Sequence, residues 1–131
     1  MTLIEISEKI RDHMTKQKAV SRTASGCAYR GEGGLKCAVG CLIDDDSYTS
    51  DLEQRSVPHG PVIKAIESSL GIEITSGCLR MLKMWQKYHD QLCYYRWVGH
   101  KDGDPVPNYN LESPTDFHNS MLVDINNGIY A

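Results

Sequence analysis

Apolar residues recur about every three to four positions in four parts of the chain, the spacing of helices that bury one face. Thr2 and Glu5 have the spacing of a capping box, so the first of these helices is expected to begin at residue 3. Pro61 suits the first turn of the second helix, and Ser113 can cap the last. The predicted helices span residues 3–18, 61–70, 75–92 and 114–127.

A different pattern occupies residues 35–43, LKCAVGCLI, which are apolar around the whole circumference of a helix except at Lys36. This pattern predicts a further helix that is buried on most sides. Gly40 in its middle would weaken a helix by about 1 kcal/mol relative to alanine, so we expect another backbone to approach it closely. The expected fold class is mainly α, with about five helices and at most a small β-hairpin.

Length and composition predict a single compact domain over residues 1–131, with a long irregular insertion at about residues 94–113. Hydrophobic residues make up 40% of the sequence, which is enough for one core. The formal net charge of −3 does not favour nucleic acid as a partner, and no apolar run reaches the about 18 residues of a membrane span. Because the first residues do not resemble a secretory leader, we expect a cytoplasmic location and reduced cysteines.

The glycine-rich stretch RGEGG, residues 30–34, gives a candidate ligand site. Backbone N–H groups at a turn that leads into a helix can bind an anion such as phosphate. The order of the glycines matches neither a Walker A loop nor the dinucleotide-binding fingerprint, and a plain tight turn explains them equally well. The candidate ligand-binding residues are Arg30, Gly31, Gly33, Gly34 and Lys36.

The cysteines permit two kinds of chemistry. On a helix, Cys37 and Cys41 would share one face and could bind zinc together, although the usual zinc-ligand spacings are absent and both residues could simply belong to the core. Alternatively, Cys37 could act as a nucleophile, with His89 as its base and Asp90 orienting that base. We expect no bound cofactor.

A partner surface is the remaining candidate. The residues just before the long insertion combine aromatic rings with a cation, the composition enriched at binding hot spots, although some of these rings could be core. The candidate partner-binding residues are Tyr94, Tyr95, Arg96 and Trp97.

The stretch YRGEGGLKCAVGCLIDDDSY, residues 29–48, resembles a group of small proteins that tailed phages and prophages encode. In that group a YRG-x-x-GLKCA-x-G core follows an N-terminal amphipathic helix. A later helix ends in an element like Q-x-x-HD, which corresponds here to residues 86–90. The resemblance implies a phage setting and the cytoplasm of an infected bacterial host.

Two functions are compatible with these observations. Small phage proteins often act by occupying a host component. We therefore expect an accessory protein that blocks a host component, such as a defence system, by stoichiometric binding of a host protein or a nucleotide signal. Such a protein could also be a homo-oligomer. The alternative is a small thiol- or metal-dependent enzyme that uses Cys37, His89 and Asp90.

Overall fold

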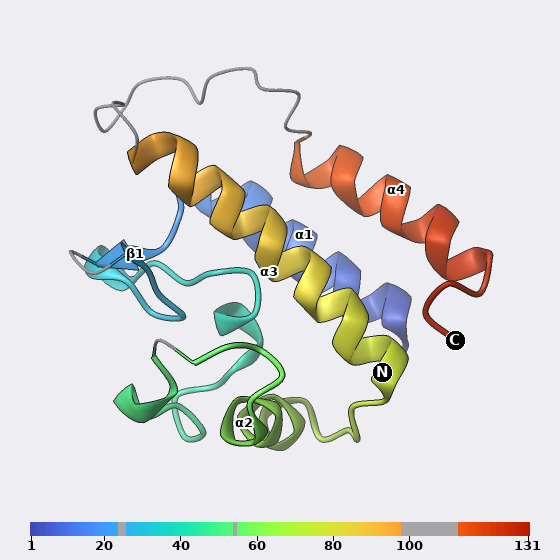
Figure 1. The fold of residues 1–131 in the computed structure, drawn as a ribbon, viewed down its shortest axis with the longest axis horizontal. Helices are drawn as coiled ribbons and strands as arrows, with labels where there is room; N and C mark the ends of the chain where they lie inside the picture. Colours follow the sequence, from blue (N-terminus) through green and yellow to red (C-terminus); the bar gives the residue numbers. More distant parts are fainter. Residues whose placement is uncertain (24–25, 54, 98–112) are drawn as a thin grey trace.

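Helix α3 lies in the middle of the molecule, and the other elements are arranged around it (Figure 1). The computed structural model describes residues 1–23, 26–53, 55–97 and 113–131, with the backbone alone for residues 93–97. Its regular elements are α1 (Leu3–Gln17), β1 (Arg22–Thr23), β2 (Gly26–Cys27), α2 (Gly60–Leu70), α3 (Ser76–Trp97) and α4 (Pro114–Asn126). Short 3-10 turns lie at Glu32–Gly34, Gly40–Leu42 and Ser50–Leu52. The predicted fold class, mainly α with a small hairpin, is confirmed.

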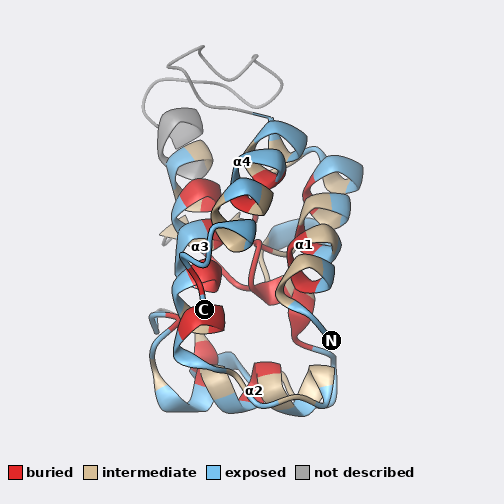
Figure 2. Cartoon of the chain, turned by 90° about the vertical axis from the view of Figure 1, so that its right-hand side faces the viewer, coloured by how far each residue is buried: buried red, intermediate tan, exposed pale blue. Residues whose placement is uncertain are grey.

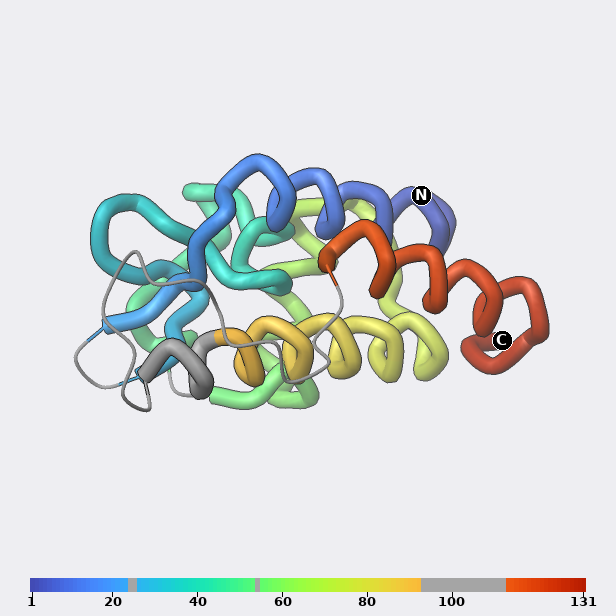
Figure 3. Tube along the Cα trace, turned by 90° about the horizontal axis from the view of Figure 1, so that it is seen from above, coloured from blue at the N-terminus to red at the C-terminus, as the bar shows by residue number. Residues whose placement is uncertain are grey.

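Helices α1, α3 and α4 run side by side, and α2 lies across one end of them (Figure 2). Seen from above, α1 and α3 flank the irregular segment that follows the hairpin, whereas α4 lies toward the other end of this pair (Figure 3). Strands β1 and β2 form an antiparallel pair in which Arg22 lies opposite Cys27. The capping box of Thr2 and Glu5 is present at the start of α1, and the side chain of Ser113 caps α4, as predicted.

A buried polar network joins α1, α3 and α4, the three helices that run side by side. The indole Nε1 of Trp85 on α3 donates a hydrogen bond to Oγ of Ser7 on α1, at 3.0 Å. The same Oγ lies 2.7 Å from Nδ1 of His118 on α4. All three side chains are essentially inaccessible to solvent, and the ring of Phe117 packs edge-on against Trp85. Because a buried polar group is costly unless it is hydrogen-bonded, this network favours one relative placement of the three helices.

Residues 35–43 are largely buried as expected, but they do not form a helix, so the described residues contain four α-helices. Glutamine side chains from neighbouring helices bind the backbone of this segment. Oε1 of Gln17 accepts from the N–H of Lys36 at 2.9 Å, and Oε1 of Gln86 accepts from the N–H of Val39 at 3.2 Å. The N–H of Val39 therefore does not make the bond to the carbonyl of Leu35 that an α-helix over residues 35–43 requires, although the N–H of Cys41 bonds to the carbonyl of Cys37, at 3.1 Å.

The close backbone approach predicted at Gly40 is confirmed. A Cβ atom at this position would lie 2.1 Å from the carbonyl oxygen of Tyr29. The same Tyr29 carbonyl accepts a hydrogen bond from the N–H of Cys37, at 3.2 Å. The two stretches of chain are thus held together by a backbone hydrogen bond, and only a glycine leaves room for this contact.

Helix α3 ends later than predicted, so the irregular stretch expected at residues 94–113 begins later. The backbone remains helical to Trp97, about one turn beyond the expected end near Leu92. The first part of the proposed irregular stretch is therefore helical. Its remainder, residues 98–112, lies outside the described residues.

We predict that Gly40→Ala lowers the free energy of unfolding by about 2 kcal/mol or more, because the added methyl group overlaps a backbone oxygen that is hydrogen-bonded in place. Urea unfolding measures the change. Gly60→Ala is the matched control, since a Cβ there meets nothing within 4 Å. Equal destabilisation by both substitutions would contradict the packing argument.

We also predict that mild acid destabilises the protein. Burial, together with the charge of Arg11, lowers the pKa of His118, and burial lowers the pKa of His13. Unfolded histidine titrates near pH 6.5, so below that value the unfolded chain binds protons that the folded chain does not. The stabilisation is therefore complete above about pH 6.5 and is lost as the pH falls toward the lower folded pKa.

Urea unfolding at pH 7.5 and 5.5 measures this loss. His118→Asn, which keeps a polar atom near the position of Nδ1, should reduce the difference between the two pH values even if it lowers stability at both. The prediction is wrong if the native protein is equally stable at both pH values.

Candidate functional site

A pocket of about 650 Å³ opens between α3 and two segments that precede α2. Residues 27–29, Glu53 and residues 55–58 form one wall, and the α3 face from Lys83 to Gln91 forms the other. Pockets of about 300–1,000 Å³ are typical of small-molecule sites. This pocket is therefore the main candidate site among the described residues.

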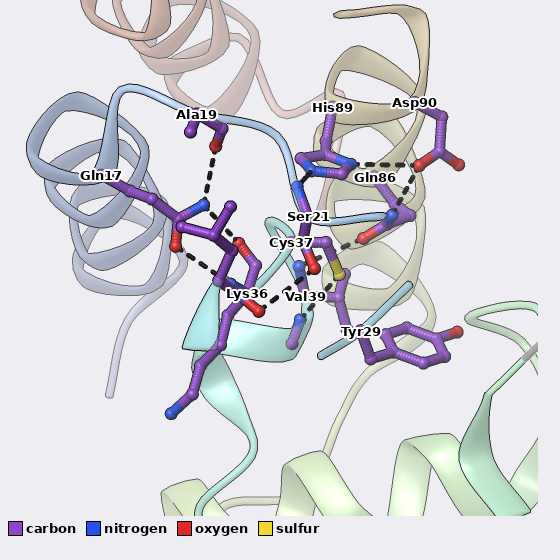
Figure 4. A network of polar contacts seen from close by, with 12 residues as sticks. Gln17, Ala19, Ser21, Tyr29, Lys36, Cys37, Val39, Gln86, His89 and Asp90 are labelled. Atoms are coloured by element: carbon purple, nitrogen blue, oxygen red, sulfur yellow. Dashed lines mark hydrogen bonds and ion pairs between the residues drawn. The ribbon is translucent and has the colours of Figure 1, made fainter. Parts of the chain in front are cut away.

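His89 lies directly behind the α3 wall and has a defined tautomer. Its side chain is completely buried, and Nε2 accepts a hydrogen bond from the backbone N–H of Ser21 at 3.0 Å (Figure 4). Because Nε2 accepts, the proton of the neutral ring must be on Nδ1. Nδ1 lies 3.2 Å from Oδ1 of Asp90 and can donate its proton to it.

Asp90 receives a second hydrogen bond that fixes its orientation. Nε2 of Gln86 donates to the same Oδ1 atom, at 2.8 Å. The other carboxylate oxygen, Oδ2, points away from both His89 and Gln86 (Figure 4). The side chain is 47% exposed and forms part of the pocket wall. Oδ2 is thus a hydrogen-bond acceptor that the fold holds at the pocket.

The donor atoms of Cys27, His89 and Asp90 lie within 4.8 Å of one another, close enough to suggest a metal site. The tautomer of His89 does not fit that role. A neutral histidine that binds a metal through Nδ1 carries its proton on Nε2, and here that proton would point at the N–H of Ser21. The described geometry therefore favours hydrogen bonding at His89 over metal binding.

The predicted pair Cys37 and Cys41 also makes structural contacts. Sγ of Cys37 accepts from the N–H of Gly40 at 3.2 Å, whereas Sγ of Cys41 donates to the carbonyl of Ala38 at 3.0 Å. Burial raises the pKa of both thiols, that of Cys41 to about 12. The metal-ligand group found among the described residues does not include this pair.

The three predicted catalytic residues lie in one region, but their geometry does not suit a thiol enzyme. Cys37 is completely buried, and its raised pKa disfavours the reactive thiolate. His89 is the expected base, but the only nitrogen lone pair of its neutral ring is on Nε2 and accepts from the N–H of Ser21. Asp90 contacts Nδ1 of the imidazole at 3.2 Å, but the other ring nitrogen accepts from a backbone amide and is not directed at Cys37.

The glycine turn brings the backbones of Arg30 and Lys36 opposite each other in an antiparallel bridge, but the charge of Arg30 is already engaged. The guanidinium of Arg30 contacts Asp45 at 2.8 Å and stacks 4.2 Å above the ring centroid of Tyr48, so it is already paired. The carbonyl of Lys36 is bound by Gln17 and by Nε2 of His13, which places its backbone inside the fold.

The glycines themselves have structural roles. Gly33 and Gly34 have φ angles of 73° and 76°, which glycine adopts without strain, as a turn requires. A Cβ on Gly31 would lie 2.5 Å from the backbone nitrogen of Arg22. These observations agree with the plain-turn interpretation.

The backbone amides next to this turn do bind an anionic group, but that group is a side chain of the protein itself. The carboxylate of Glu53 accepts from the backbone N–H groups of Tyr29, at 2.9 Å, and Arg30, at 3.1 Å. The hydroxyl of Tyr48 donates to the same carboxylate at 2.5 Å, and the pKa of this tyrosine is raised to about 12 by partial burial and by Glu53. Glu53 therefore has most of its hydrogen-bonding capacity occupied.

The pocket has three basic residues, Lys83, Lys87 and Arg55, and the sequence did not indicate that they would meet. Two lysines four positions apart on a predicted helix share one face, and this signal was available. Their meeting with Arg55 across the pocket depends on the tertiary fold. The predicted partner residues Tyr94, Tyr95, Arg96 and Trp97 lie in the last turns of α3, but their side chains are outside the described part, so that surface stays a prediction.

Comparison with known proteins gives no relative: no family model, curated protein or solved structure matches the chain. No helix among the described residues is long and apolar enough to cross a membrane. The class that fold and site define is thus a mainly α protein with a small-molecule-sized pocket beside its central helix.

We predict that His89 carries its proton on Nδ1 at neutral pH, because Nε2 accepts from Ser21. Long-range ¹⁵N–¹H NMR correlation distinguishes the two tautomers, and zinc added to the protein should leave the His89 signals unchanged. A proton on Nε2, or a shift of the His89 signals on zinc addition, would favour the metal site instead.

We also predict that His89→Ala lowers the free energy of unfolding by about 2–3 kcal/mol, because it creates a cavity and leaves a buried N–H without an acceptor.

Proposed function

We propose that the protein is a phage-encoded accessory protein that acts by stoichiometric binding. In this proposal the pocket beside α3 takes up a small organic anion of nucleotide size and withholds it from a host component, such as a defence system. The phage setting rests on the resemblance of residues 29–48 to small phage proteins. The ligand class rests on the charges of the pocket.

The observation that carries the proposal is a pair of lysines on the α3 wall of the pocket; with Arg55 they make three cations against the two carboxylates of Glu53 and Asp90. Lys83 and Lys87 lie one turn apart on α3, and neither has an ion-pair partner among the described residues. Like charges at this spacing destabilise a helix by about 0.2–0.5 kcal/mol, and a bound anion would relieve that repulsion.

Other lining residues suit the rest of such a ligand. Across the pocket, Arg55 is oriented by the carbonyl of Asp51, at 2.6 Å, and by Nε2 of His59, at 2.9 Å, and further N–H groups of its guanidinium remain to bind a ligand. Val57 and Pro58 add apolar surface that a flat ring could cover.

Stoichiometric binding is favoured over catalysis by how the candidate catalytic groups are used. The thiol of Cys37 is buried with a raised pKa, and the imidazole of His89 is engaged on both nitrogens. A nucleotide bound in the pocket would meet cations and hydrogen-bonding groups but no activated nucleophile from these residues.

We predict that nucleoside monophosphates bind with an affinity that falls as salt is raised, because phosphate pairs with the pocket cations. The double substitution Lys83→Gln with Lys87→Gln should weaken binding about tenfold, which corresponds to about 1.4 kcal/mol. Isothermal titration calorimetry measures both effects. The matched control is Lys16→Gln with Lys64→Gln, which removes the same charge from exposed positions outside the pocket.

The ligand recovered after denaturation should have an unchanged mass, since the proposal is binding without conversion. If no nucleotide binds, the proposed ligand class is wrong. If both double variants weaken binding equally, the effect comes from net charge and the pocket is not the site. If the recovered ligand is chemically altered, the enzyme alternative is favoured.

A further inference from the structure

The pocket has opposite chemical character at its two ends. Lys83 and Lys87 lie toward the start of the lining stretch of α3, and Asp90 lies toward its end. The rise of an α-helix places Lys83 and Asp90 about 10 Å apart along its axis. A mononucleotide extended along α3 would place its phosphate and the edge of its base at a comparable separation.

The free oxygen of Asp90 can only accept hydrogen bonds. Oδ1 already receives hydrogen bonds from Gln86, at 2.8 Å, and from His89, at 3.2 Å. These two donors hold the carboxylate in one orientation, and Oδ2 points away from both of them (Figure 4). Because His89 is itself fixed by the N–H of Ser21, the acceptor is presented by a chain of contacts, buried at His89 and partly exposed at Asp90, that no ligand needs to assemble.

We infer that Asp90 determines which base the pocket prefers: a nucleotide whose base carries an exocyclic amino group, with its phosphate at Lys83 and Lys87 and its amino group on Oδ2 of Asp90. This inference rests on the proposed function. An amino group donates to the carboxylate, whereas a carbonyl at the same ring position directs lone pairs at it. Adenine and cytosine nucleotides should therefore bind more tightly than hypoxanthine and uracil nucleotides.

The fixed orientation of Asp90 gives a sharper expectation for Asp90→Asn. An asparagine can keep its oxygen toward the two donors, Gln86 and His89, and then its NH₂ group replaces Oδ2 at the pocket. The variant would present a donor where the native protein presents an acceptor. Its preference should therefore reverse toward bases with a carbonyl at that position, with little change in folding.

The experiment compares two matched ligand pairs by calorimetry on the full chain: adenosine with inosine 5′-monophosphate, and cytidine with uridine 5′-monophosphate. In the native protein we expect the amino-bearing member of at least one pair to bind about tenfold more tightly. In Asp90→Asn the preference for that pair should reverse. Asp46→Asn, an exposed aspartate outside the pocket, is the matched control and should keep the native preference.

The outcomes separate this inference from the proposed function. If nucleotides bind without a preference for the amino group, or if Asp90→Asn keeps the native preference, Asp90 does not select the base, and the proposed function stands. If none of the four nucleotides binds the native protein, the ligand class of the proposed function fails, and the inference fails with it. Thermal unfolding of both variants checks that the fold is retained.

Discussion

The hydrogen bond from the N–H of Ser21 to Nε2 of His89 is the contact on which the pocket side of the molecule depends. It joins the chain just before β1 to the middle of α3, across a completely buried imidazole. An N–H donor leaves the ring one neutral tautomer, and that tautomer directs Nδ1–H at Asp90. One backbone amide therefore connects the chain before the hairpin to α3, determines which nitrogen of the histidine carries the proton, and so helps to orient a carboxylate at the pocket.

The same face of α3 uses the same physical principle at a second position. Trp85 lies one helical turn before His89, and its indole N–H reaches Ser7, which also contacts His118. Both α3 residues bring a polar atom into an apolar interior, where an unmet hydrogen bond is costly. Apolar packing alone tolerates small shifts between helices, whereas these bonds need defined partners. Consecutive turns on one face of α3 thus contact α1 and α4 at Trp85 and the segment before β1 at His89.

The sequence predicted those parts of the fold that local chemistry determines. The capping residues Thr2 and Ser113 mark their helix starts because a cap acts on the nearest backbone amides. The α-helix predicted at residues 35–43 is absent, and residues distant in sequence hold the backbone there: Gln17 binds the N–H of Lys36, and Gln86 binds the N–H of Val39. The burial pattern there was informative, but a segment that is apolar on all sides reports burial without specifying its backbone geometry.

The candidate site was less predictable for the same reason. Residues chosen for their type, such as Cys37 and Arg30, prove to be engaged in packing or ion pairing, which no local pattern reveals. The pocket instead lies between α3 and a wall made of residues 27–29, Glu53 and residues 55–58, and the carboxylate of Glu53 holds this wall together by binding the backbone amide of Tyr29. Both parts of the resemblance therefore reach the pocket: Tyr29 of the YRG-containing motif lines one wall, and Gln86 and Asp90 of the element like Q-x-x-HD line the other. Lys83 and Arg55, in contrast, come from stretches without a motif, so their meeting at the pocket follows from the tertiary fold.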